Sequence, residues 1–115
     1  MTVYESELTP GNLKYAHIYI TPFLDKLPPD VFGGTNVHAP APRRVRLEFD
    51  TLCTDTFVTT DMEGKPRSFF QDRAFVRDFF ARKGANPGDV VRFEEVTPYH
   101  FHLSLKPAAG KVIAT

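Results

Sequence analysis

The stretch RAFVRDFFARKGANPGDVVRF, from Arg73 to Phe93, decides most of the fold because it joins a helix to a strand. Four of its apolar residues fall at positions i, i+1, i+4 and i+5, the spacing of one buried helix face. They are Phe75, Val76, Phe79 and Phe80. Asp72 is a suitable N-cap, and Gly84 favours the left-handed conformation that follows a last helical turn. The stretch therefore predicts a helix from Arg73, a turn at Asn86-Pro87-Gly88 and a strand at Val90–Val96.

Alternation of apolar and polar residues predicts further strands along the chain. In RVRLEFD, Arg44–Asp50, three apolar side chains face inward, which is typical of a half-buried antiparallel strand. Other strands are expected at Val3–Leu8, Tyr15–Thr21, Thr54–Asp61, Ser68–Phe70 and Tyr99–Leu105. TPGN at Thr9–Asn12 favours a turn, and PFLDKL one helical turn before Pro28-Pro29. These elements predict an α+β or mostly-β domain, built as a small barrel or sandwich.

Length and composition favour one small domain. The chain has 115 residues, of which we expect 1–106 to fold and 107–115 to form a flexible tail or linker. The single cysteine, Cys53, allows no internal disulfide and suggests a reducing compartment. No signal segment and no apolar run of about 20 residues is visible, so we expect a cytoplasmic protein without a membrane partner.

The distribution of charge says more than its total. The 14 basic and 14 acidic side chains cancel, which excludes a strong overall field toward nucleic acid. The stretch from Lys65 to Arg92, however, contains seven basic residues and only three acidic ones. The sequence therefore predicts a local positive surface.

Three sets of residues suggest catalysis or metal binding. Asp30, Glu63 and Lys65 resemble the two carboxylates and lysine of a Mg²⁺-dependent nuclease, but Gly64 places the last two on a loop tip. His100 and His102 share a strand face and would chelate a metal only if further ligands converge, so we interpret them as the polar face of the strand. Cys53 fits a small buried side chain better than a nucleophile. We therefore expect no catalytic residue, metal or cofactor in this domain.

The order of the motifs resembles the B3-like DNA-binding pseudobarrel, found in plant transcription factors and as the effector or recognition domain of EcoRII-type restriction endonucleases. LTPGNLKYAHIYIT (Leu8–Thr21) is similar to that family's opening turn and strand. The stretch at Arg73–Phe93 is similar to its aromatic-rich helix and Gly-Asp-Val-Val strand start. PPDVFGG and VTTDMEGKPRSFFQDR look more like the restriction branch than the plant branch.

The resemblance implies a mostly-β, seven-stranded open pseudobarrel with short flanking helices, which holds double-stranded DNA with two arms in the major groove. The arms would be Thr9–His17 and Asp61–Gln71. The DNA-binding residues implied are Asn12, Lys14, Tyr15, His17, Glu63, Lys65, Arg67, Gln71 and Arg73. By side-chain chemistry, Asn12, Arg67 and Gln71 would contact base edges, Glu63 would accept from cytosine amino groups, and Lys14, Lys65 and Arg73 would contact phosphates.

The sequence thus predicts a sequence-specific DNA-recognition domain of a type II restriction endonuclease, with cutting performed by a fused or separate nuclease domain. A CCWGG-like duplex is the first target that the resemblance suggests. Two alternatives remain open. One is a stand-alone Mg²⁺-dependent nuclease that uses Asp30, Glu63 and Lys65, and the other is a β-barrel protein–protein adaptor without a nucleic-acid role.

Overall fold

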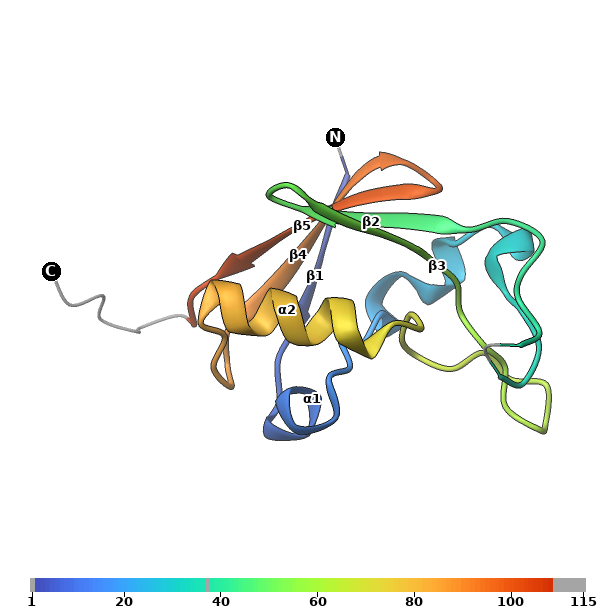
Figure 1. The fold of residues 1–115 in the computed structure, drawn as a ribbon, viewed down its shortest axis with the longest axis horizontal. Coiled ribbons are helices and arrows are strands. Elements are labelled where there is room, and N and C mark those ends of the chain that lie inside the picture. The colour runs from blue at the N-terminus through green and yellow to red at the C-terminus, as the bar shows by residue number, and fades with distance from the viewer. Residues whose placement is uncertain (1, 37, 109–115) are drawn as a thin grey trace, which may run out of the picture.

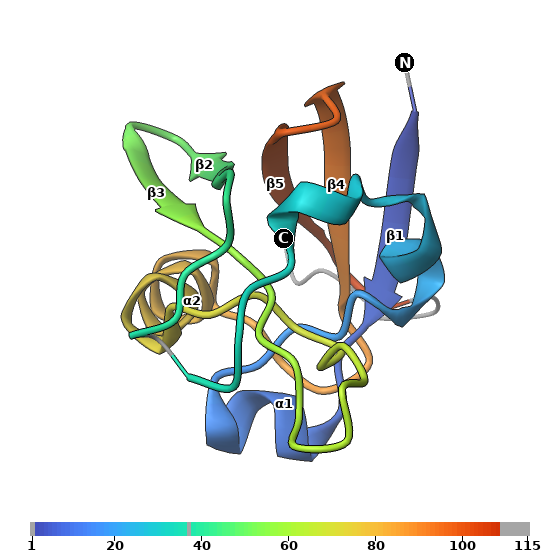
Figure 2. The same cartoon turned by 90° about the vertical axis from the view of Figure 1, so that its right-hand side faces the viewer.

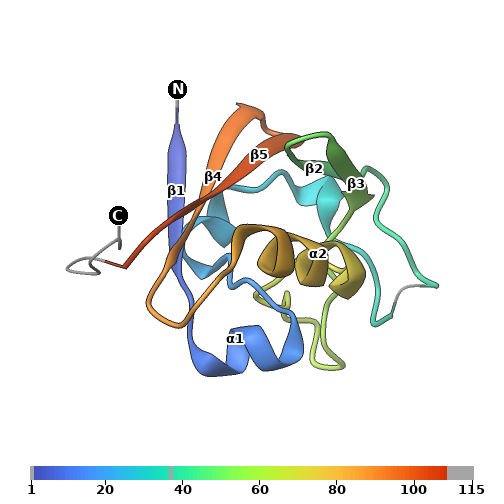
Figure 3. The same cartoon turned by 60° about the vertical axis from the view of Figure 1, so that its left-hand side comes forward.

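The computed structural model of the chain describes residues 2–36 and 38–108, so most of the tail expected at 107–115 lies outside the described residues. Its centre is one open, mixed sheet with the strand order β1-β4-β5-β2-β3 (Figure 3). The strands are β1 (Val3–Glu7), β2 (Val45–Phe49), β3 (Leu52–Thr56), β4 (Val90–Thr97) and β5 (His100–Lys106). β2 and β5 run parallel, and every other neighbouring pair is antiparallel.

The long helix α2 (Arg73–Lys83) lies under the sheet, as its apolar spacing predicts (Figure 1). The rings of Phe75 and Phe79 meet Phe49 of β2 edge-on, with centroids 5.2 and 5.1 Å apart. Gly84 ends the helix with a φ of 61°, which confirms the predicted left-handed C-cap. Burial of each of these phenylalanines contributes about 1.5–3 kcal/mol, which fixes α2 against the sheet.

Two short 3₁₀ helices precede β2 in the chain, and the first of them packs against β1. They are η1 (Thr21–Lys26) and η2 (Pro29–Val31), and η1 confirms the helical turn predicted before Pro28. Phe23 of η1 is fully buried and stacks on Tyr4 of β1, with centroids 4.6 Å apart. The same ring lies 5.5 Å from that of Phe101 on β5. One face of the sheet is therefore covered by α2 and η1, and the core lies between them.

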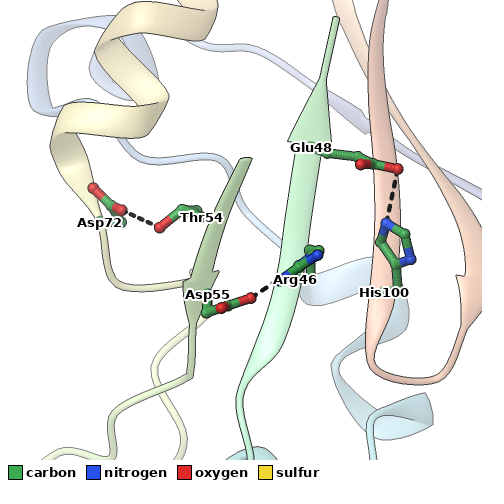
Figure 4. Close-up of polar contacts among 6 residues, drawn as sticks. All are labelled: Arg46, Glu48, Thr54, Asp55, Asp72 and His100. Atoms are coloured by element: carbon green, nitrogen blue, oxygen red, sulfur yellow. Dashed lines mark hydrogen bonds and ion pairs between the residues drawn. The ribbon is translucent and has the colours of Figure 1, made fainter. Parts of the chain in front are cut away.

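The opposite face of the sheet is polar. Arg46 pairs with Asp55 across β2 and β3 at 3.2 Å. His100 of β5 lies 2.8 Å from Glu48 of β2 (Figure 4).

No helix in the described part of the chain has the length and apolar character needed to cross a bilayer.

The strand predicted at Tyr15–Thr21 is wrong, as is the turn predicted at Thr9–Asn12. The chain instead forms helix α1 (Pro10–Tyr15), with Pro10 in its first turn and Thr9 as N-cap. Ala16 adopts the left-handed conformation with a φ of 55° and ends α1. The two isoleucines that suggested a strand, Ile18 and Ile20, are buried in an irregular segment in which the Ile20 amide bonds to the Ser68 carbonyl.

Two further strand predictions need correction. β3 ends at Thr56 instead of continuing to Asp61, because the chain leaves the sheet there. Val58 and Thr60 make only isolated bridges, to Phe32 and Pro66. Ser68–Phe70 forms a bend instead of a strand, and Phe70 is buried in the core. The α+β class is confirmed, and the described residues contain five strands in an open sheet, with no closed barrel.

Candidate functional site

The two segments predicted as arms project on the same side of the molecule. Figures 1 and 2 show α1 and the 61–67 loop below the level of α2, away from the sheet. A pocket of about 350 Å³ lies where the segments that follow them meet the start of α2. Four of the predicted DNA-binding residues line it, namely His17, Arg67, Gln71 and Arg73. The fold therefore brings residues of both arms to one site.

An aromatic pair forms one wall of the pocket. The ring of His17 stacks on that of Phe69, with centroids 3.8 Å apart and planes inclined by 10°. Arg73 Nε donates a hydrogen bond of 3.3 Å to Nε2 of His17. Partial burial and the nearby Arg73 charge lower the pKa of His17 below its ordinary 6.5. His17 is therefore neutral at pH 7, and because Nε2 accepts, its proton is on Nδ1.

Gln71 lies on another side of the pocket and is held by three hydrogen bonds. Its side-chain Nε2 donates to the Thr59 hydroxyl at 2.9 Å. Its backbone N–H donates to the Phe57 carbonyl at 2.9 Å, and its own carbonyl accepts from the Thr56 hydroxyl. The segment after β3 therefore fixes both the backbone and the amide group of Gln71.

Asp72 connects the pocket to the sheet and to α2. Its Oδ2 accepts from the Thr54 hydroxyl of β3 at 2.5 Å (Figure 4). Its Oδ1 accepts from the Phe75 amide at 3.1 Å. The φ of Asp72 is 131°, a strained value for a residue with a side chain, which costs about 1–3 kcal/mol. The two hydrogen bonds offset this strain and fix the start of α2 beside the pocket.

The loop at 61–67 is a preformed turn. Asp61 Oδ1 accepts from the amides of Glu63 and Lys65, each at 2.9 Å, and Gly64 has a φ of 82°. These hydrogen bonds lower the pKa of Asp61. The Arg67 amide then bonds to the Thr59 carbonyl at 2.8 Å, which closes the base of the loop. Glu63, Lys65 and Arg67 are exposed, as a DNA-contacting role requires.

The α1 side presents fewer of the predicted residues. Lys14 is exposed, with its ammonium 5.3 Å from the ring centroid of Tyr15, and Tyr15 itself is 54% exposed. Asn12 is only 1% exposed, and its side-chain oxygen accepts from the amide and hydroxyl of Thr9 at 2.8 and 3.1 Å. We therefore assign Asn12 to the capping of α1 and leave it out of the DNA-contacting set.

Sequence reasoning missed several residues of the pocket. Phe69 was expected in a strand, yet it stacks on His17, while the adjacent Phe70 is buried. Thr59 was expected in a strand, and Asn36 in an irregular connection, but both line the pocket. The one usable signal was the pair Phe69-Phe70 beside polar residues, because consecutive aromatic residues cannot both point into one core face.

The residues considered for catalysis lie on different elements of the fold. Asp30 on η2 accepts from the Tyr99 hydroxyl, at 3.0 and 3.1 Å, whereas Glu63 and Lys65 belong to the exposed loop. Within residues 2–36 and 38–108, no group of three or more His, Cys, Asp or Glu side chains could hold a metal ion. Cys53 is exposed on β3, which corrects its expected burial.

No protein-family model, curated protein or solved structure matches this chain. The geometry of the pocket and the two projecting segments, together with the chemistry of their side chains, is what indicates a function.

Proposed function

We propose that this domain binds double-stranded DNA in a sequence-specific way, with α1 and the 61–67 loop entering the major groove. The observation that carries the proposal is the convergence of His17 with Arg67, Gln71 and Arg73 around one pocket between these projections. His17 and Arg73 are 56 positions apart in the chain and joined by a hydrogen bond. The projections are thus parts of one surface, as two-arm recognition requires.

The side chains of this surface suit base and phosphate recognition. Arginine can bind guanine with two hydrogen bonds, glutamine can do so with adenine, and glutamate accepts from the cytosine amino group. Arg67, Gln71 and Glu63 supply these groups from the second projection, and Lys14 and Lys65 are exposed cations that suit phosphates. Because Asp61 organises the loop in the free protein, little ordering entropy is lost on binding.

The resemblance to B3-like domains supports the same proposal. The bridges Phe32–Val58 and Thr60–Pro66 pair extended segments outside the five strands, and we propose that they correspond to the remaining strands of a seven-stranded pseudobarrel. In this proposal the protein is the cytoplasmic recognition domain of a restriction endonuclease. A separate nuclease domain or chain would cut the DNA.

Selection from randomised duplexes, followed by mobility-shift titration, tests the proposal, with a CCWGG-like duplex as the first single probe. We expect one sequence to be enriched at low salt. Arg67→Ala should relax the preference at one position and weaken binding by about 1–3 kcal/mol.

Arg46→Ala is the matched control, because Arg46 is exposed on the opposite face of the sheet and paired with Asp55. It should leave both affinity and preference unchanged. If no sequence is enriched, or if Arg46→Ala has the same effect as Arg67→Ala, the proposal is wrong.

A further inference from the structure

We propose that the pocket beside His17 and Phe69 receives a single adenine or cytosine base rotated out of the bound duplex. This inference rests on the proposed DNA binding and adds a ligand for the pocket itself. The reading of base edges by the loop at 61–67 does not require such a cavity. In this inference Gln71, which lines the pocket, binds the extruded base instead of a base edge in the groove.

The size of the pocket suits a small planar ligand. Its volume of about 350 Å³ lies at the lower end of the range for small-molecule sites, about 300–1,000 Å³. The two bases of a stacked pair present only their edges in a groove. A protein can contact those edges without a cavity of this size. A base that leaves the stack needs both a cavity and a surface that replaces its lost stacking.

The His17–Phe69 pair provides that surface. The two rings are nearly parallel, and His17 is fixed further by the hydrogen bond from Arg73. Both rings are only partly buried, and both line the pocket. A base can therefore stack against an aromatic surface that is already ordered in the free protein, which lowers the cost of its extrusion.

The polar groups of the pocket can hydrogen-bond to the pairing edge of adenine or cytosine. Gln71 Nε2 carries a second N–H besides the one donated to Thr59. Each Asp72 carboxylate oxygen accepts one hydrogen bond within the protein and can accept another. Together they offer a donor and an acceptor, which match the ring nitrogen and amino group on the pairing edges of adenine and cytosine.

The same residues argue against a phosphate as the occupant. Arg67 and Arg73 would attract an anion, but the acidic residue Asp72 also lines the pocket. Its carboxylate also occupies the amide of Phe75 at the start of α2, where a phosphate would otherwise bind. The pocket thus favours a neutral ring with hydrogen-bonding groups, and the arginines are left to contact the backbone on either side of it.

The test places a fluorescent base at each adenine and cytosine of the selected duplex in turn, using 2-aminopurine for adenine and pyrrolocytosine for cytosine. Both probes fluoresce more strongly when they leave the base stack. With saturating protein, we expect a severalfold rise at one position and no rise at the others. Mobility shift on the same duplexes reports binding independently.

Two variants of Phe69 connect the signal to the pocket. Phe69→Leu keeps apolar bulk but removes the aromatic face, and should abolish the rise and weaken binding about tenfold, a typical loss for one base–aromatic stack. Phe69→Tyr retains the ring and should retain the rise. Thermal unfolding checks that both variants are folded.

The outcomes separate this inference from the proposed function. A mobility shift without a fluorescence rise at any position overturns the base pocket and leaves DNA binding intact. A rise that persists in Phe69→Leu also overturns it, because the base would then be received elsewhere. If no duplex is shifted, the proposed function fails, and the base pocket fails with it.

Discussion

At the scale of single residues, His17 connects the pocket to pH. Burial and the Arg73 charge lower its pKa in the folded protein below the 6.5 of an unperturbed histidine, so the unfolded chain binds the proton more readily. The neutral ring therefore contributes stability above pH 6.5, and this stability is lost as the pH falls from 6.5 toward the lower folded-state pKa. We expect the melting temperature to fall between pH 7.5 and 5 by more in the wild type than in His17→Gln.

His17→Gln is a suitable comparison because glutamine offers Arg73 an acceptor but does not titrate. Both proteins contain the same carboxyl groups, so we take the difference between the two pH profiles as the contribution of His17. A direct measurement comes from the NMR titration of the His17 ring. A His17 pKa at or above 6.5, or identical pH profiles for the two proteins, would contradict the prediction.

At the scale of secondary-structure elements, the start of α2 depends on Asp72. Asp72→Ala removes the helix cap and the bond to Thr54 while it keeps a side chain at a φ of 131°. We expect a loss of about 1–2 kcal/mol in the free energy of unfolding, the usual cost of a lost N-cap. Asp72→Gly loses the same hydrogen bonds but removes the backbone strain, and should cost less.

Urea denaturation of the two variants measures this difference. If Asp72→Gly is as destabilising as Asp72→Ala, backbone strain at this position contributes nothing to the stability of the protein. An Asp78→Ala control, at an exposed position within α2, should change stability by less than about 0.5 kcal/mol.

Elements with a regular period could be predicted, whereas those fixed by local capping or distant contacts could not. α2 and β4 follow from the apolar spacing on either side of Gly84. α1 was missed because the Pro and Gly of TPGN favour a turn, and because Asn12 occupies the capping-box position where glutamate or glutamine is usual. Thr54–Asp61 has the β-branched composition of a strand, but after Thr56 its backbone pairs with isolated segments instead of the sheet.

At the scale of the whole molecule, the candidate site was predicted as two loops but not as a pocket. Both loops carry residue types that suit DNA, and these types can be read from the sequence. The stacking of His17 on Phe69 and the bond from Arg73 depend on how α1 packs against α2, a contact between segments far apart in the chain. No local pattern reports such a contact, so the residues that shape the pocket had to come from the structure.

The balanced charge of the molecule leads to a last prediction. With 14 basic and 14 acidic side chains, the protein has no overall attraction to DNA, so the salt dependence of binding should come from a few phosphate contacts. If Lys65 makes one of them, Lys65→Ala should reduce the slope of log K against log salt by about one unit. Lys106→Ala changes the net charge equally, but Lys106 lies on β5 beside Glu5, at 3.7 Å, and should leave the slope unchanged. Mobility-shift titrations between 50 and 200 mM salt, roughly the range over which such slopes are resolved, compare the two. If the two variants have equal slopes, the salt dependence of binding follows the total charge of the protein. The 61–67 loop then does not hold the DNA backbone.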